Sequence, residues 1–263
     1  NYLAHLAVYR TALLHAAGGF RPGFEGSQDW DLALRVSELT TPARIVHLPR
    51  ILYHWRAIPG STALALGQKD YHTAAARRAL EEHFTRTKQP AELIAVAGGH
   101  WRVRHPLPPA PPLVSIIIPT HNGLEHLRRC ISSLQEKTTY PRYELIIVDN
   151  RSDDPATLSY LREIAEAGGR VIPYAAPFNY SAINNLAARH ARGELLAFLN
   201  NDLEVITPDW LEEMAAQALR PEIGAVGAML YYPDKRIRHA AAGLGIGCVA
   251  GDALKLSPRG GDG

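Results

Sequence analysis

The sequence has few of the features that mark secreted or membrane-spanning proteins. It contains only two cysteines, Cys130 and Cys248, and they show no spacing typical of a disulfide framework or a zinc site. We therefore expect two buried thiols in a reducing compartment, with a disulfide as the alternative. No apolar run approaches the roughly 20 residues that a membrane-spanning helix needs, and no signal peptide is visible at Asn1. These absences predict a cytoplasmic protein and leave peripheral association with the inner face of the plasma membrane open.

The chain also lacks a strong excess of charge of either sign. Its 28 Lys and Arg residues and 26 Asp and Glu residues give a net charge of +2, and the basic residues are scattered. This distribution argues against nucleic acid as a partner. With 46% hydrophobic and 21% charged residues over 263 positions, the composition is that of a globular protein with one large domain or two small ones.

The first part of the chain alternates short apolar runs with turns. The pattern predicts a helix over residues 29–37 and short strands over residues 43–48 and 51–55. Residues 71–87 are rich in Ala, Arg and Glu and contain neither Pro nor Gly, which predicts a helix. The five prolines within residues 106–112 predict a stiff, extended linker and mark the clearest boundary in the chain.

After the linker, the pattern becomes an alternation of strands and helices. Expected strands cover residues 114–118, 145–148, 171–174, 195–199 and 223–231. Because the first two are continuous apolar runs, we expect them to be covered on both faces. The alternation predicts an α/β fold with a mainly parallel sheet.

Helices are expected between these strands. Apolar residues at helical spacing, from Leu124 to Leu134, predict the first helix. Asp154 followed by Pro155 predicts the start of the next one, with Asp as cap and Pro at the first helical position. Ser181 is the expected cap of a helix that stops near Gly193, and a further helix is expected to begin at Thr207-Pro208.

Polar side chains follow three of the expected strands. In parallel α/β sheets, ligands bind beyond the carboxyl ends of the strands. These ends carry Thr120-His-Asn122, Asp149-Asn150 and Asn200-Asn-Asp202. We therefore expect the three groups to converge on one crevice.

Several ordered motifs give the second half a family resemblance. The segments concerned are residues 114–122, 145–153, 178–185, 191–193 and 199–202. Together they resemble glycosyltransferase family 2, closest to bacterial polysaccharide and rhamnosyl-transferase members. The resemblance implies the GT-A fold, a Rossmann-like, mainly parallel sheet flanked by helices. It also implies an inverting, metal-dependent transfer of a sugar from a nucleotide-diphosphate donor to a glycan or lipid-linked saccharide acceptor in bacterial surface polysaccharide synthesis.

The resemblance implies roles for individual residues in the second half. Asp149 matches the carboxylate that hydrogen-bonds the nucleotide base, and Asp202 matches the last carboxylate of the Asp-x-Asp motif that binds Mn²⁺ or Mg²⁺. A hard cation with oxygen ligands would neutralise the diphosphate leaving group. The remaining nucleotide-binding residues would be Pro119, Thr120, Asn122, Asn150, Asn184, Asn200 and Asn201. Asn150 and Asn200 stand where the family usually has acidic residues, which predicts modest metal affinity.

The first half resembles the end of the same kind of domain. Residues 26–32 resemble the family's Glu-Asp motif, with Asp29 where the catalytic base lies. An inverting transfer needs one carboxylate to take the proton of the acceptor hydroxyl. The alternatives are that Asp29 caps a helix or that Asp31 is the base.

Two further motifs of the first half belong to this resemblance. Residues 53–56 match a late motif that contacts the diphosphate, with His54 as a metal ligand and Arg56 as a phosphate clamp. For His54, a packed histidine is an equally good interpretation. Gly18-Gly-Phe20 matches the turn before the acceptor loop.

The order of the motifs is permuted relative to the family. Residues 1–88 carry the acceptor and catalytic-base part with a trailing helix, residues 89–112 the linker, and residues 113–263 the nucleotide-sugar part. The simplest history is a tandem transferase from which a central piece was cut. We expect the two parts to pack as one GT-A unit, within one chain or in a homodimer by exchange of halves. The alternative is a non-catalytic nucleotide-sugar-binding fragment; a dinucleotide fingerprint at residues 245–250 is too weak to favour an oxidoreductase.

Overall fold

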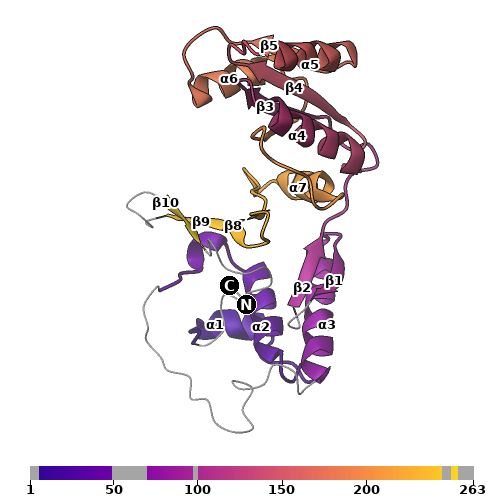
Figure 1. The fold of residues 1–263 in the computed structure, drawn as a ribbon. Coiled ribbons are helices and arrows are strands. Elements are labelled where there is room, and N and C mark those ends of the chain that lie inside the picture. The colour runs from indigo at the N-terminus through magenta and orange to yellow at the C-terminus, as the bar shows by residue number, and fades with distance from the viewer. Residues whose placement is uncertain (1–5, 49–69, 97–99, 245–249, 254–263) are drawn as a thin grey trace. The chain divides into compact units, whose positions relative to one another are not determined.

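A computed structural model describes residues 6–48, 70–96, 100–244 and 250–253. The chain forms two compact units, Asn1–Pro106 and Leu107–Gly263 (Figure 1). The division falls at the first proline of the Pro-rich segment. No helix among the described residues is long and apolar enough to cross a membrane.

The described residues of the first unit form three helices, a turn of 3₁₀ helix and a hairpin. Its elements are α1 (Thr11–Ala16), α2 (Gln28–Glu38), η1 (Pro42–Arg44), α3 (Asp70–Thr87), β1 (Glu92–Val96) and β2 (His100–Arg104). The strands β1 and β2 are antiparallel, and Glu92 pairs with Arg104. The stretch expected as a linker thus contains the strands β1 and β2, and residues 105–113, which follow β2, lack regular structure.

Helices α2 and α3 form the core of this unit. The apolar side of α2 contributes Leu32 and Val36, and α3 presents Ala75, Ala76 and Ala79, all buried. Alanines leave room for a close approach of the two helices. Ion pairs at the edge add to this contact: the Glu38 carboxylate lies 2.8 Å from the guanidinium of Arg86, and Glu82 lies 2.7 Å from that of Arg21.

Two of the three testable predictions for this unit are confirmed. The predicted helices at residues 29–37 and 71–87 correspond to α2 and α3. The predicted strand at residues 43–48 is wrong. Pro42 begins a 3₁₀ turn there. Val46 and Leu48 are 74% and 62% exposed, so these apolar side chains are not buried as they would be on the inner face of a strand. The predicted strand at residues 51–55 lies outside the described residues.

The second unit is built on a four-stranded parallel sheet. Its order is β5-β4-β3-β6, with β3 (Val114–Thr120), β4 (Tyr143–Asp149), β5 (Arg170–Pro173) and β6 (Leu195–Phe198). Four helices flank it: α4 (Leu124–Lys137), α5 (Pro155–Glu166), α6 (Tyr180–His190) and α7 (Trp210–Ala218). Two short antiparallel pairs follow, β7 (Leu230–Tyr231) with β8 (Ile237–His239), and β9 (Ala241–Leu244) with β10 (Ala250–Ala253).

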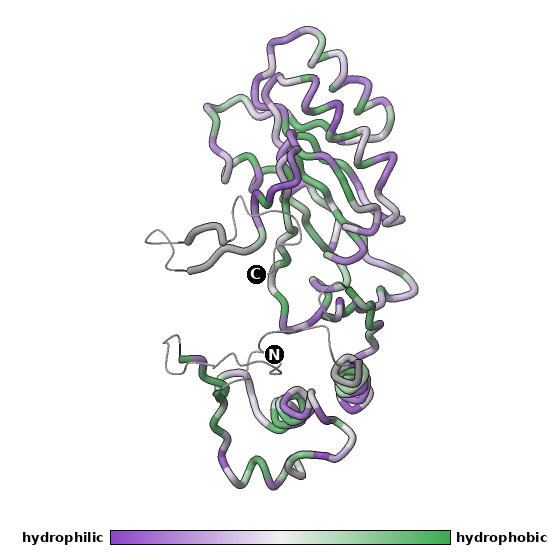
Figure 2. Tube along the Cα trace, turned by 60° about the horizontal axis from the view of Figure 1, so that its bottom comes forward, coloured by the Kyte–Doolittle hydropathy of each residue, from purple (hydrophilic) through white to green (hydrophobic). Residues whose placement is uncertain are grey.

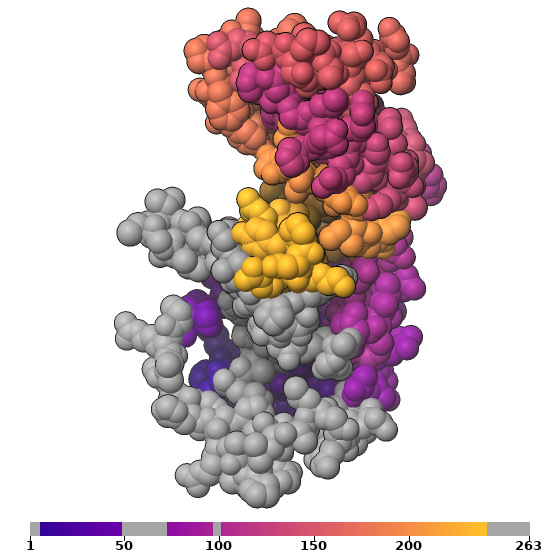
Figure 3. Space-filling view, in the orientation of Figure 1, coloured from indigo at the N-terminus to yellow at the C-terminus, as the bar shows by residue number. Residues whose placement is uncertain are grey.

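Each face of the sheet has its own apolar cluster. On one face, Ile116 and Ile118 pack against α4, α5 and α7. On the other, Ile117 and Ile146 pack against α6 through Ile183 and other residues. Figure 2 shows the apolar residues concentrated along the strands, and in Figure 3 α4 forms part of the outer surface turned to the viewer. The predicted α/β fold with a parallel sheet covered on both faces is confirmed.

Of the two predicted helix caps, one is confirmed and one is wrong. The Asp154 carboxylate caps α5 by accepting a hydrogen bond from Thr157 N at 2.8 Å, as predicted. The predicted cap at Ser181 is wrong. Asn179 caps α6 instead, accepting from Ala182 N at 3.0 Å, because an extended Asn two residues earlier already satisfies the first turn.

Two other boundaries also differ from the prediction. The last helix begins at Trp210 rather than at Thr207-Pro208, which form a turn before it. The predicted strand over residues 223–231 is reduced to Leu230–Tyr231. The described part of this stretch contains Gly224 and Gly227, which weaken a strand.

Candidate active site

The carboxyl ends of β3 and β4 lie side by side. In the parallel register, Thr120 pairs with Asp149, the last residue of each strand. Several hydrogen bonds join the loops that follow. Among them, Asn150 N donates to Thr120 O at 2.8 Å, His121 Nδ1 lies 2.9 Å from Asn150 O, and Asn122 N donates to Ser152 Oγ at 2.8 Å. The structure therefore brings together two of the three predicted groups. The hydrogen-bonded surface that they form at the ends of β3 and β4 is called the floor.

The Asn122 side chain holds this floor together. Its Oδ1 accepts from the backbone amides of Asp153 and Asp154 at 3.0 and 3.1 Å, and its Nδ2 donates to Asp153 Oδ1 at 2.8 Å. The backbone of Asn122 is in the left-handed region, with φ of 50°, which Asn tolerates better than most residues. Asn122 was predicted to bind the nucleotide. In the structure, its side-chain amide instead holds the loop after β4.

Asp149 presents a carboxylate at this floor. Its Oδ1 accepts from Ser152 N at 3.0 Å, and the residue is half-buried. Within the described ranges, Ser152 is the one group that hydrogen-bonds to this carboxylate, so Oδ2 can accept from a ligand. The hydrogen bond with Ser152 fixes the orientation of the group before a ligand arrives.

The turn after β6 adds the third group. Asn201 Nδ2 donates to Thr120 Oγ1 at 3.0 Å, which ties this turn to the end of β3. The β3–β6 pairing ends at Ile117, two residues before Pro119, which has no N–H to continue it. Asp202 follows Asn201 with an exposed side chain. All three predicted groups thus meet at one end of the sheet.

Cys130 lies beneath that turn. Its Sγ is 3.7 Å from Asn200 O, and the side chain is buried. Burial raises the pKa of the Cys130 thiol to about 11, and the negative charge of Asp202 adds to the shift. Cys130 is a free, buried thiol, as predicted. Cys248 lies outside the described residues.

Asn150 explains one departure from the family's acidic pattern. It is buried, and its Nδ2 donates to Tyr174 O at 3.1 Å and to Ala176 O at 3.0 Å. A carboxylate has no N–H and would repel both carbonyl oxygens. Asn150 therefore fixes the loop between β5 and α6.

Asn184 on α6 has an unsatisfied acceptor. The side chain is 7% exposed, and its Nδ2 donates to Tyr180 O at 2.8 Å. In the part of the chain that the structure describes, its buried Oδ1 accepts no hydrogen bond. Such an atom is costly to leave unpaired, which makes it a candidate contact for a ligand.

The Ala191-Arg-Gly193 motif lies at the opposite end of the sheet. Gly193 N donates to Ser115 Oγ at 2.9 Å, and Arg192 Nε donates to Glu144 Oε2 at 2.8 Å. Ser115 and Glu144 are near the amino ends of β3 and β4. A Cβ on Gly193 would come within 2.6 Å of Ser115 N, so only glycine fits. This motif supports packing rather than chemistry.

In the first unit, the two candidate base residues have different surroundings. Asp29 is half-buried in the first turn of α2, and Ser27 is the N-cap. Burial raises the pKa of Tyr9, and the negative charge of Asp29 raises it further. Sequence reasoning had not singled out Tyr9.

Asp31, in contrast, is committed to ion pairs. Its side chain is fully buried and contacts the guanidinium groups of Arg21 and Arg35. Burial alone would raise the pKa of Asp31, but hydrogen bonds from the two arginines outweigh this and lower it. A carboxylate so paired is a poor proton acceptor. The Asp-x-x-x-Arg spacing on α2 was the signal that could have revealed the pair.

Two predicted site residues, His54 and Arg56, lie outside the described residues, as does most of the weak glycine motif. Among the residues that are described, no three His, Cys, Asp or Glu side chains gather as a metal-binding group.

A parallel sheet with polar side chains at the carboxyl ends of three adjacent strands defines the class of α/β nucleotide-binding domains. Residues 115–243 of this chain match the model of the family described as Glycosyl transferase family 2. Residues 115–243 therefore form a glycosyltransferase family 2 domain, and the sheet of the second unit is that of the GT-A fold.

Two relatives match along nearly the whole chain. It is 47% identical over 262 residues to uncharacterized protein y4gI of Sinorhizobium fredii, and the match covers 98% of this chain and 29% of that relative. It is 41% identical over 260 residues to O-antigen biosynthesis protein RfbC of Myxococcus xanthus, which covers 99% of this chain and 20% of the relative. The chain thus spans less than a third of each relative, and both contain the two units in the same order.

Among solved structures, the chain is similar to mannosyltransferase PcManGT from Pyrobaculum calidifontis in complex with GDP-Man and Mn²⁺. The identity is 25% and the TM-score 0.44, over 61% of this chain and 46% of that one.

Proposed function

We propose that this chain is part of an inverting glycosyltransferase. It would move a sugar of the hexosyl or rhamnosyl type from a nucleotide-diphosphate donor to a glycan or lipid-linked saccharide in bacterial surface polysaccharide synthesis. The observation that carries the proposal is that Thr120, Asp149 and Asn201 meet at one end of a family 2 sheet. The RfbC relative, named for O-antigen biosynthesis, supports the polysaccharide context.

The donor would bind at the carboxyl ends of β3, β4 and β6. Asp149 would accept a hydrogen bond from an N–H of the base through Oδ2, with Oδ1 held by Ser152. Asn184 Oδ1 would receive a hydrogen bond from the donor. Pro119, Thr120, Asn122 and Asn150 would shape the floor, and Asn200 and Asn201 would line the diphosphate.

A divalent cation fits the residues present at the crevice. Asp202 is an exposed carboxylate beside two asparagines whose amide oxygens suit Mg²⁺ or Mn²⁺. Mg²⁺ is commonly held by one or two protein carboxylates together with substrate phosphates, and Asp202 would supply such a carboxylate. Such a cation would stabilise the charge of the departing nucleoside diphosphate. His54 and Arg56 are proposed to assist as metal ligand and phosphate clamp.

Asp29 is proposed as the base for the acceptor hydroxyl. It stands half-buried in the first turn of α2, whereas Asp31 is fully engaged by arginines. One carboxylate suffices, because a single inversion needs no glycosyl-enzyme intermediate. The donor crevice lies in one unit and Asp29 in the other, so we propose that both units serve one reaction, within one chain or by exchange between two chains.

Calorimetric titration of UDP, dTDP and GDP, with Mn²⁺ and then with EDTA, tests the donor site. We expect one nucleotide to bind in a metal-dependent manner and Asp202→Ala to abolish the binding. Asp234→Ala, which removes an exposed carboxylate of the same unit, is the matched control and should bind normally. Well-folded protein that binds none of the three nucleotides would overturn the proposal.

A second candidate function is favoured by the separation of motifs between two units. The chain would bind a nucleotide sugar without transferring it, the missing parts being supplied elsewhere in a longer protein such as the relatives. Metal-dependent donor binding without sugar transfer or donor hydrolysis would support this reading.

A further inference from the structure

The loop between α1 and α2 is held rigidly by three arginines. Arg35 donates to the carbonyl oxygens of Ala17 and, at 2.7 Å, of Gly19. Arg78 of α3 donates to Gly23 O. Arg21, within the loop, donates to Asp31 through Nε at 3.2 Å. These contacts fix a segment that has no regular secondary structure, including Gly19 with φ of 65°.

The two phenylalanines of this loop differ in exposure. Phe24 is 4% exposed and packs beneath the guanidinium groups of Arg21 and Arg78, at 4.3 and 4.8 Å from its ring centre. Phe20 is 63% exposed. A large apolar ring held in solvent by an ordered loop loses little freedom when a ligand covers it, so it is well suited to binding.

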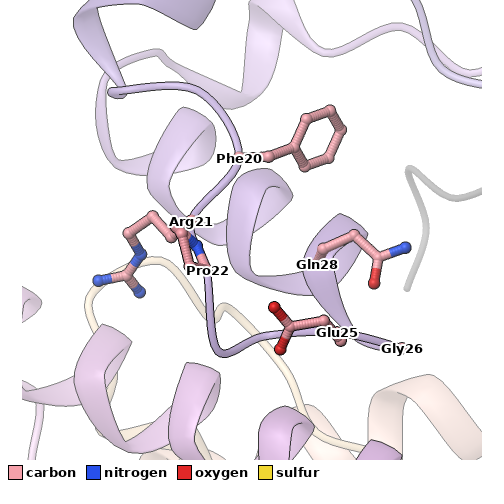
Figure 4. Close-up of a pocket in the computed structure, with 6 residues that line it drawn as sticks. All are labelled: Phe20, Arg21, Pro22, Glu25, Gly26 and Gln28. Carbon is pink, nitrogen blue, oxygen red and sulfur yellow. The ribbon is translucent and has the colours of Figure 1, made fainter.

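A depression of about 490 Å³ adjoins this ring. It is lined by Phe20, Arg21, Pro22, Glu25, Gly26 and Gln28 (Figure 4). In Figure 4 the Phe20 ring and the Gln28 amide extend to the same side of the loop, and Arg21 extends the other way.

The polar groups of the depression favour a neutral ligand rich in hydroxyls. Glu25 Oε1 accepts from Gly23 N at 2.9 Å, which orients the carboxylate and, by this hydrogen bond, lowers the pKa of Glu25. An ionised carboxylate accepts hydrogen bonds from hydroxyls and repels anions. The Arg21 charge does not offset it, because that guanidinium pairs with Asp31 and Glu82.

We propose that Phe20, Glu25 and Gln28 form a subsite for a pyranose ring of the acceptor glycan. The apolar C–H face of the sugar would lie on the Phe20 ring, and its hydroxyls would bond to the Glu25 carboxylate and the Gln28 amide. Gln28 directly precedes Asp29, so the subsite would hold the acceptor next to the base. This inference rests on the proposed function, which supplies the acceptor and the role of Asp29.

Labelling of the ring carbons of phenylalanine tests the subsite directly. The chain contains five phenylalanines, so the Phe20 resonance can be assigned by comparison with Phe20→Tyr. Methyl β-D-galactoside, methyl β-D-N-acetylglucosaminide and methyl α-L-rhamnoside would be titrated separately into the full chain. We expect at least one to shift the Phe20 signal saturably.

Three variants separate ring stacking from general apolarity. Phe20→Leu should weaken saccharide binding by about tenfold or more, because it keeps an apolar group but removes the flat ring. Phe20→Tyr should bind as the parent does, with the affinity of every variant read from the signals of the titrated glycoside. Leu39→Ala, which trims another exposed apolar side chain of the same unit, should have no effect. A Phe20 signal that no glycoside moves, or equal affinity in Phe20→Leu, would overturn the subsite.

Titration of UDP, dTDP and GDP into the same samples keeps the two proposals apart. Saccharide binding that depends on Phe20, in protein that binds no nucleotide, supports the sugar site and overturns the transferase assignment. Nucleotide binding without any response of the Phe20 signal to a saccharide supports the transferase assignment and overturns the sugar site.

Discussion

Asp31 and Arg35 lie one helical turn apart on α2 and form a buried ion pair, with Arg35 Nη2 2.5 Å from Asp31 Oδ2. The same carboxylate contacts Arg21, and Arg35 reaches back to the carbonyl oxygens of Ala17 and Gly19. The pair therefore links α2 to the loop that carries Phe20. It places a buried charge within two residues of the proposed base.

Replacing Asp31 by Asn should strongly destabilise the first unit. Arg35 would lose its buried counter-charge and Arg21 would keep only Glu82, and breaking a buried pair costs about 3–5 kcal/mol. Urea unfolding monitored by circular dichroism measures the loss. Glu81→Gln, which removes an exposed ion pair with Arg77 on α3, is the control and should cost about 0–1 kcal/mol. Equal effects of the two substitutions would show that the Asp31 pairs contribute no more than surface pairs.

The same pair predicts a pH dependence. The pKa of Asp31 is lowered in the folded protein, so its ionised form adds stability above the unfolded pKa of about 3.9. This contribution is lost as the pH falls through the lower, folded-state pKa. The stability difference between the parent and Asp31→Asn should therefore be constant near neutral pH and should narrow below about pH 4. A difference that stays constant down to pH 2 would contradict the lowered pKa.

The meeting of the three polar groups at one end of the sheet could be predicted from the sequence because it follows from topology. Continuous apolar runs gave β3 and β4, and parallel strands place their last residues, Thr120 and Asp149, at the same edge. What could not be predicted is the use of each polar atom. Asn122 and Asn150 stand in the motif, but only coordinates show that their amides bond to the protein's own loops. That choice depends on where loops from other strands run.

The errors in the secondary structure have a similar origin. Ser181 and Asn179 are both residues that cap helices well, and the local sequence does not decide between them. The direction in which the chain enters α6 makes Asn179 the cap. Residues 223–229 have an apolar pattern that predicts a strand, yet a strand also needs a paired neighbour. The described residues give that pairing only to Leu230–Tyr231.

Asn150→Asp should destabilise the second unit more than its small change in size suggests. The new carboxylate would face the carbonyl oxygens of Tyr174 and Ala176 without an N–H to offer either. The loss of two hydrogen bonds at a buried site predicts about 1–3 kcal/mol. Asn200→Asp, an identical exchange at an exposed asparagine, is the matched control and should be nearly neutral. If Asn150→Asp is also neutral, the amide does not hold the loop between β5 and α6.

Gly193→Ala should destabilise the same unit through a backbone clash. The added Cβ would lie 2.6 Å from Ser115 N and 2.7 Å from Leu113 O, and neither backbone atom can move without disturbing β3. Forced overpacking of this kind costs about 1–3 kcal/mol. Gly224→Ala meets nothing within 4 Å and should leave the midpoint of thermal unfolding almost unchanged. Equal midpoints for both variants would show that the contact between Gly193 and β3 is looser than the structure has it.

Asp29→Asn tests the chemical step separately from binding. The amide keeps the size of the side chain but cannot accept the proton of an acceptor hydroxyl. General-base catalysis contributes about 10²–10⁴-fold, so kcat for sugar transfer should fall within that range. The dissociation constant of the donor nucleotide, measured by calorimetry with Mn²⁺, should stay within a factor of about two, because Asp29 is proposed to contact the acceptor hydroxyl and not the donor. Glu81→Gln serves again as the control of the same unit and should leave both quantities unchanged. A large loss of donor affinity with little change in kcat would assign Asp29 to the donor rather than to the acceptor and would remove it as the base.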